Sequence, residues 1–118
     1  MTAGPAGVWT VAEVAGRPVA GPRPPVLRFD DDGHLSGTTG VNRLTATWTL
    51  GGGVLTLGPL MMTRRAGPPE RMALESALVA ALEGPLAVAP DGDGLRLGGP
   101  AGVLLRPLEG TEAEAGEP

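Results

Sequence analysis

The chain of 118 residues contains no cysteine and no tyrosine, and it has only one histidine, one phenylalanine and two tryptophans. Lysine, isoleucine and glutamine are also missing, so all nine basic residues are arginines. Without cysteine, the chain can form no disulfide, no thiolate metal site and no thiol nucleophile. The skewed composition, with 20 glycines and 13 prolines, indicates the codon bias of a GC-rich genome rather than a particular function.

Charge and hydropathy argue against two classes of partner. The net charge is −4, and the arginines are scattered rather than gathered in a basic stripe, so we expect no nucleic acid partner. No run of about 18 apolar residues is present, so we expect no transmembrane segment. Residues 1–7 lack the basic and apolar regions of a signal peptide. The expected location is therefore cytoplasmic for the sequence as given, or exported and envelope-associated if a leader was removed.

The length fits one domain, which we expect to be a monomer. Residues 1–7 are predicted to be a disordered leader, residues 8–107 the folded domain, and residues 108–118 an acidic flexible tail. Within the domain, alternating apolar and polar residues bounded by Gly and Pro predict short strands. They lie at 8–14, 26–30, 34–37, 43–50, 54–58, 86–89, 95–97 and 103–106.

One helix is predicted over about Pro69–Glu83, because Leu74, Leu78 and Leu82 recur on one face and Gly84-Pro85 would end it. The predicted fold class is α+β. We expect a curled antiparallel β-sheet or partly open barrel of about seven to eight strands, packed on this helix.

Several short motifs occur in an order that resembles one bacterial family. They are Trp9 in the first strand, Leu27 and Phe29 before the Asp32-Gly33 turn, Ser36-Gly37-Thr38-Thr39-Gly40-Val41-Asn42, Thr63-Arg64-Arg65-Ala66-Gly67, and Met72, Glu75, Leu78 and Leu82 on the helix. Over residues 8–107 the chain resembles the META domain, the HslJ-like family. The resemblance implies signature residues with structural roles, which here are Trp9, Phe29, Gly37, Gly40, Asn42, Trp48, Thr63 and Glu75.

Both common cysteine positions of that family are replaced, by Val41 and Gly67. Loss of both suggests that the two positions are neighbours, and we expect Val41 to pack over the gap left by Gly67. For Glu75 two arrangements are open. It pairs with Arg71 one helical turn away, or it reaches into the sheet and accepts a hydrogen bond from a loop, which we favour.

Candidate chemistry has weak support. His34 and Ser36 lie near Asp30 to Asp32, but neighbours on one strand face are too far apart for a catalytic triad. The runs Asp30-Asp31-Asp32 and Asp91-Gly92-Asp93 lack the ligand spacing of a calcium loop and indicate turns. The segment from Gly37 to Asn42 lacks the context of a phosphate-binding loop. We therefore predict no catalytic, metal or cofactor-binding residue, no cofactor and no enzyme activity.

The resemblance implies a non-enzymatic domain linked to stress or envelope processes. We expect a binding or protein-interaction module, with Arg64, Arg65 and Arg71 as a partner contact. The alternative is a small apolar-ligand carrier that uses the cleft between helix and sheet. A cavity lined by Trp48, Leu44, Leu74 and Leu78 would favour the carrier, and a filled core would favour the interaction module.

Overall fold

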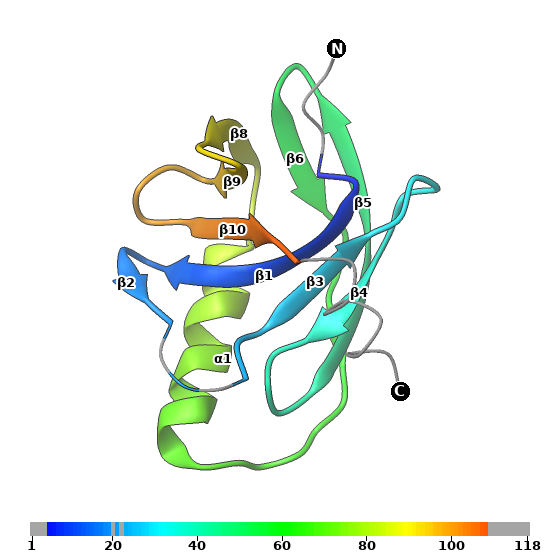
Figure 1. The fold of residues 1–118 in the computed structure, drawn as a ribbon. Coiled ribbons are helices and arrows are strands. Elements are labelled where there is room, and N and C mark those ends of the chain that lie inside the picture. The colour runs from blue at the N-terminus through cyan, green and yellow to red at the C-terminus, as the bar shows by residue number, and fades with distance from the viewer. Residues whose placement is uncertain (1–4, 20, 22, 109–118) are drawn as a thin grey trace.

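The computed structural model describes residues 5–19, 21 and 23–108, so most of the predicted leader and nearly all of the predicted tail lie outside the described residues (Figure 1). The described part contains one helix, α1 (Pro69–Ala81), and ten strands. The strands are β1 (Gly7–Val14), β2 (Arg17–Pro18), β3 (Val26–Phe29), β4 (His34–Thr38), β5 (Arg43–Gly51), β6 (Val54–Leu57), β7 (Met61–Met62), β8 (Leu86–Asp91), β9 (Gly94–Leu97) and β10 (Val103–Pro107).

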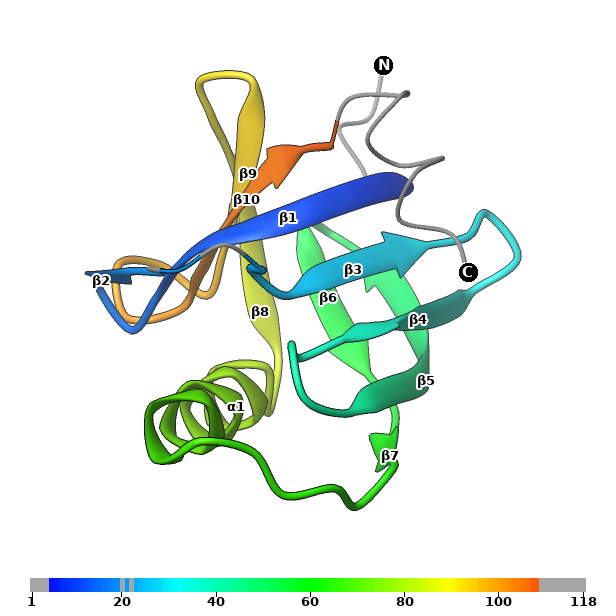
Figure 2. The ribbon, with the colours of Figure 1, turned by 60° about the horizontal axis from the view of Figure 1, so that its bottom comes forward.

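Eight of the strands form a ring that is not an even barrel. The order around it is β1-β3-β4-β5-β6-β8-β9-β10, and β10 pairs with β1 to complete the circuit. Every pairing is antiparallel, and Figures 1 and 2 show the strands curling round a common centre. The predicted α+β fold with a curled antiparallel sheet and one helix is confirmed.

The core fills the inside of this ring. Alternation along β5 turns Leu44 inward and leaves Thr45, Thr47 and Thr49 exposed, as the period of two requires. Leucine and valine from the other strands join Phe29 in one contiguous cluster. Trp48 packs at the margin, edge-on to Phe29, with 6.0 Å between the ring centroids.

The helix lies against one end of the ring (Figure 2). Leu78 and Leu82 are buried in the core, and Leu74 packs against it, so the predicted leucine stripe is the face that α1 buries. The helix ends at Ala81, two residues before the predicted end, although Leu82 still donates its backbone N–H to Leu78. Such a difference is common where the last turn changes geometry.

Strands β2 and β7, which have two residues each, were not predicted from the sequence. Neither is long enough to show alternation, and β2 contains Pro18 at an edge of the sheet, where proline is tolerated. Both pair with one strand only among those described: β2 with β1, and β7 with β5.

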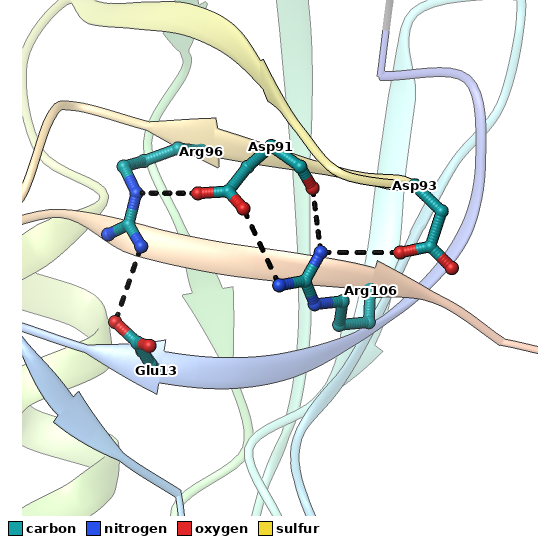
Figure 3. A network of polar contacts seen from close by, with 5 residues as sticks. All are labelled: Glu13, Asp91, Asp93, Arg96 and Arg106. Atoms are coloured by element: carbon teal, nitrogen blue, oxygen red, sulfur yellow. Dashed lines mark hydrogen bonds and ion pairs between the residues drawn. The ribbon is translucent and has the colours of Figure 1, made fainter.

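An ionic network on the outside of the ring fastens the β8–β9 hairpin (Figure 3). The Asp91 carboxylate lies 3.3 Å from Arg96 Nε and 3.5 Å from Arg106 Nη2, and the Asp91 backbone carbonyl accepts a hydrogen bond from Arg106. Arg96 also reaches Glu13 on β1, and Arg106 reaches Asp93 in the turn. These charges are paired with one another across neighbouring strands, so we assign the network to stability.

Candidate functional site

Asn42 is the centre of a buried polar network at one end of the ring. Its side chain is in the turn between β4 and β5, and the residue is 3% exposed. The Oδ1 atom accepts hydrogen bonds from Thr63 Oγ1 (2.9 Å) and from the Arg65 amide (2.6 Å). The Nδ2 atom donates to the Arg65 carbonyl (3.1 Å) and to Glu75 Oε1 (2.9 Å). One amide group therefore joins the turn, the segment after β7 and α1.

Glu75 is the helix member of this network and is 7% exposed. Its Oε1 atom accepts hydrogen bonds from Thr39 Oγ1 at 2.6 Å and from Asn42 Nδ2 at 2.9 Å. Glu75 thus reaches into the sheet, which is the arrangement that we favoured. Arg71, the other expected partner, donates instead to the Arg23 carbonyl at 2.8 Å. Charge-assisted hydrogen bonds offset the cost of burying the carboxylate.

The turn from Gly37 to Asn42 is held by Thr39, which the sequence analysis did not select. Thr39 is fully buried, and its hydroxyl accepts hydrogen bonds from the amides of Val41 and Asn42. Gly37 has no room for a side chain, because a Cβ there would overlap the Val26 carbonyl oxygen on β3. Gly40 has a φ of +98°, which favours glycine.

Val41 and Gly67 are neighbours, as the loss of both cysteines suggested. A Cβ added at Gly67 would lie 3.7 Å from the Val41 Cβ and 3.0 Å from its nearer methyl carbon. Val41 therefore packs against the space that a side chain at position 67 would occupy. Disulfides have Cβ atoms about 3.8 Å apart, so this separation would suit a bridge between cysteines at the two positions.

A groove lies over this network, between β7 and α1. We call it the β7 groove, and its volume is about 480 Å³. Its apolar lining consists of Leu60, Met62, Ala66, Met72 and Val79. Three members of the polar network, Asn42, Thr63 and Glu75, also line it, together with Arg64 and Arg65. A smaller groove adjoins it, because Met62, Glu75 and Val79 line both, and its far end carries Glu83.

A second groove lies on the other flank of α1, against β1 and the β1–β2 hairpin. We call it the hairpin groove, and its volume is about 570 Å³. Arg71 lines this groove, whereas Arg64 and Arg65 line the β7 groove. The structure therefore divides the three arginines that we expected to act together.

The cavity that would have favoured an internal carrier site is not formed by the four expected residues. Leu44 and Leu78 are buried core residues, Trp48 is at the core margin, and Leu74 lines the hairpin groove. The Trp48 indole N–H donates to the carbonyls of Asp30 and His34. Trp9 Nε1 likewise donates to the Pro5 carbonyl, and Pro5 is buried although it lies in the predicted leader.

His34 and Asp32 form an exposed pair at the β3–β4 turn, with 3.0 Å between His34 Nδ1 and Asp32 Oδ1. Hydrogen bonds from the His34 side chain and backbone, aided by its charge, lower the pKa of the Asp32 carboxyl. No group of three His, Asp or Glu side chains in the described residues has the geometry of a metal site. The one helix of the described chain is not both long and apolar enough to span a membrane.

Comparison with known proteins agrees with the motifs. Two proteins with NMR structures have similar folds: one has a TM-score of 0.66 and 26% identity over 84% of this chain and 86% of its own. The other, from Burkholderia xenovorans, has a TM-score of 0.63 and 26% identity over 84% of this chain and 78% of its own. No curated protein matches the chain significantly. The model of the META domain matches residues 3–111, and the chain therefore belongs to the META domain family.

Proposed function

We propose that this domain is a non-enzymatic protein-interaction module, and that its β7 groove binds an extended, acidic segment of a partner protein. The observation that carries the proposal is the position of Arg64 and Arg65. Both are exposed at the groove, and neither guanidinium has an ion pair or hydrogen bond within the described residues. In a chain with a net charge of −4, two adjacent arginines that no described residue pairs with would attract the acidic side chains of a partner.

Strand β7 supports an extended conformation for the partner. It pairs with β5 alone among the described strands, with Leu44 opposite Met62. The Thr63 amide donates to the Arg43 carbonyl on β5, and successive backbone amides of a strand point in opposite directions. The Met62 N–H and C=O therefore point away from β5, toward the free edge of β7. A partner strand added at that edge would satisfy them.

An apolar surface lies beside this edge. Every second side chain of an added partner strand could be buried against it. Met61 is 71% exposed and is one of two large exposed hydrophobic residues in the described chain. Met62, Leu60, Met72 and Val79 line the groove itself. Unbranched methionine side chains adapt to different partners, which suits a surface that recognises a backbone and a pattern rather than one sequence.

The charges along the groove would determine where the acidic side chains of the partner lie. Arg64 and Arg65 are at one end, whereas Glu83 lines the far end of the adjoining groove. An acidic segment would therefore place its carboxylates near the arginines and keep them away from Glu83. The Glu75 carboxylate lies between, but Thr39 and Asn42 already donate to it.

A pentapeptide of alternating glutamate and valine, with a fluorescent dye at its N-terminus and an amide at its C-terminus, tests the proposal by fluorescence anisotropy. We expect saturable binding that Arg64→Glu and Arg65→Glu together weaken by about tenfold or more, because each exposed ion pair contributes up to about 1 kcal/mol. Arg17→Glu, the same charge reversal in the hairpin groove, is the control and should change the affinity much less. Equal binding of a lysine–valine peptide, or equal effects of all three reversals, would contradict the proposal.

A further inference from the structure

The hairpin groove has the features of a small-molecule site. Its walls are mostly apolar: Val14 of β1 is buried, Val19, Leu74 and Ala77 are half-buried, and Pro18 and Pro68 stand at the sides. A volume of about 570 Å³ lies within the range of about 300–1,000 Å³ that is typical of ligand sites. Apolar side chains left open to water in this way would gain by contact with an apolar ligand.

Two guanidinium groups line the same groove. Arg71 is half-buried, and its Nη1 donates to the Arg23 carbonyl, which holds the side chain in place. Arg17 in β2 is exposed, and its guanidinium has no ion pair or hydrogen bond within the described residues. Glu70 also lines the groove, so the three charged groups leave one net positive charge.

We propose that the hairpin groove binds a small amphiphile that has an apolar body and one anionic group. The body would lie on Val14, Val19 and Leu74. The anionic group, a carboxylate or a sulfonate, would take hydrogen bonds from the guanidinium of Arg17, with Arg71 adding positive charge. A neutral apolar ligand would use the same walls but would gain nothing from the arginines.

This site is distinct from the β7 groove. Residues Glu70, Ala73, Leu74 and Ala77 turn one flank of α1 toward the hairpin groove. Met72, Glu75 and Val79, on the other flank of α1, line the β7 groove. The proposal therefore stands independently of the proposed function, and each site has its own variants.

Two fluorescent probes with the same aromatic skeleton separate the apolar and charged contributions. They are 8-anilino-1-naphthalenesulfonate, which is anionic, and N-phenyl-1-naphthylamine, which lacks the sulfonate. We expect the folded protein to bind both saturably, with the anionic probe bound more tightly. Arg17→Ala should weaken the anionic probe about three- to fivefold and leave the neutral probe unchanged, as expected for one exposed ion pair.

Filling the groove should block both probes. Ala73 is an exposed residue that lines it, so Ala73→Phe places a ring over the apolar walls without entering the core. Ala80→Phe is the matched control, because Ala80 is also exposed on α1 but lines the groove that adjoins the β7 groove. Circular dichroism melts of each variant check that it is folded, so that binding of a probe to unfolded chains is recognised.

Three outcomes would overturn the proposal. They are no saturable binding of the probes, an equal loss of affinity for both probes in Arg17→Ala, or a loss of probe binding in Ala80→Phe but not in Ala73→Phe. Co-sedimentation with phosphatidylglycerol vesicles separates two sources of the ligand. Retention on vesicles would assign the anionic group to a lipid, and its absence would assign it to a dissolved amphiphile. In both cases the groove variants should act on the same binding event.

Discussion

Replacing Glu75 tests the polar network most sharply. In Glu75→Ala, Thr39 Oγ1 and Asn42 Nδ2 both lose the acceptor that lies 2.6 and 2.9 Å away, and both residues are buried. A hydrogen bond to a charged group contributes about 1.5–3 kcal/mol, and an unsatisfied buried donor costs a similar amount. We expect the free energy of unfolding to fall by about 3–5 kcal/mol, a large part of the 5–15 kcal/mol typical of small domains.

Glu75→Gln separates the charge from the hydrogen bonds. Both donors use the same oxygen, Oε1, so a glutamine oxygen in that place can accept both bonds. Only the charge assistance is lost, and we expect a cost of about 1–2 kcal/mol. The two substitutions should therefore differ by at least about 1 kcal/mol.

Urea denaturation followed by tryptophan fluorescence measures these values. With a slope of about 1–3 kcal/mol per molar urea, the Glu75→Ala midpoint should fall by about 1–5 M. Glu83→Ala is the control, because Glu83 is exposed just after α1 and its carboxylate has no hydrogen bond or ion pair within the described chain. Its cost should stay within about 0.5 kcal/mol. If Glu75→Ala costs no more than Glu83→Ala, the network does not stabilise the fold and the reasoning fails.

Three further predictions concern other parts of the structure. Val41→Cys with Gly67→Cys should form a disulfide that raises stability by about 2–4 kcal/mol under oxidising conditions; two thiols that stay free would contradict the geometry. Asp32 should titrate below its ordinary pKa of about 3.9 in an NMR titration, and His34→Ala should raise that pKa. Because the folded-state pKa is the lower one, this pair stabilises the fold above pH of about 4 and loses that contribution as pH falls through the folded pKa. Gly37→Ala should cost several kcal/mol in thermal melts, since its Cβ would overlap a backbone oxygen of β3.

The strands and the helix that could be predicted are those whose own residues show a regular pattern of apolar and polar side chains. Alternation over residues 43–50 predicts β5, and the leucine stripe predicts α1, because each pattern reports which side faces the core. Strand β7 has only two residues, and it exists because Thr45 and Leu44 lie opposite it. Such a strand depends on tertiary pairing, which no local pattern reveals.

The candidate sites were predictable only in part. The resemblance pointed to Asn42, Thr63 and Glu75, which the fold brings together. The resemblance did not reveal that Arg71 lines a different groove from Arg64 and Arg65. Arg71 is in the first turn of α1, and its side chain donates to the backbone carbonyl of Arg23. Arg23 lies just before β3, and the pairing of β3 with β1 fixes its position. A contact between segments that far apart in the chain depends on the whole ring.

Hydrogen exchange at the Met62 amide is the most direct test of the proposed interaction. This N–H points toward the free edge of β7, so it should exchange quickly in the free protein and slow markedly when the glutamate–valine peptide binds. The Met61 amide, which points toward β5, should change little. If the peptide binds while Met62 exchanges as fast as before, no strand has added to β7, and the proposed mode of interaction is wrong.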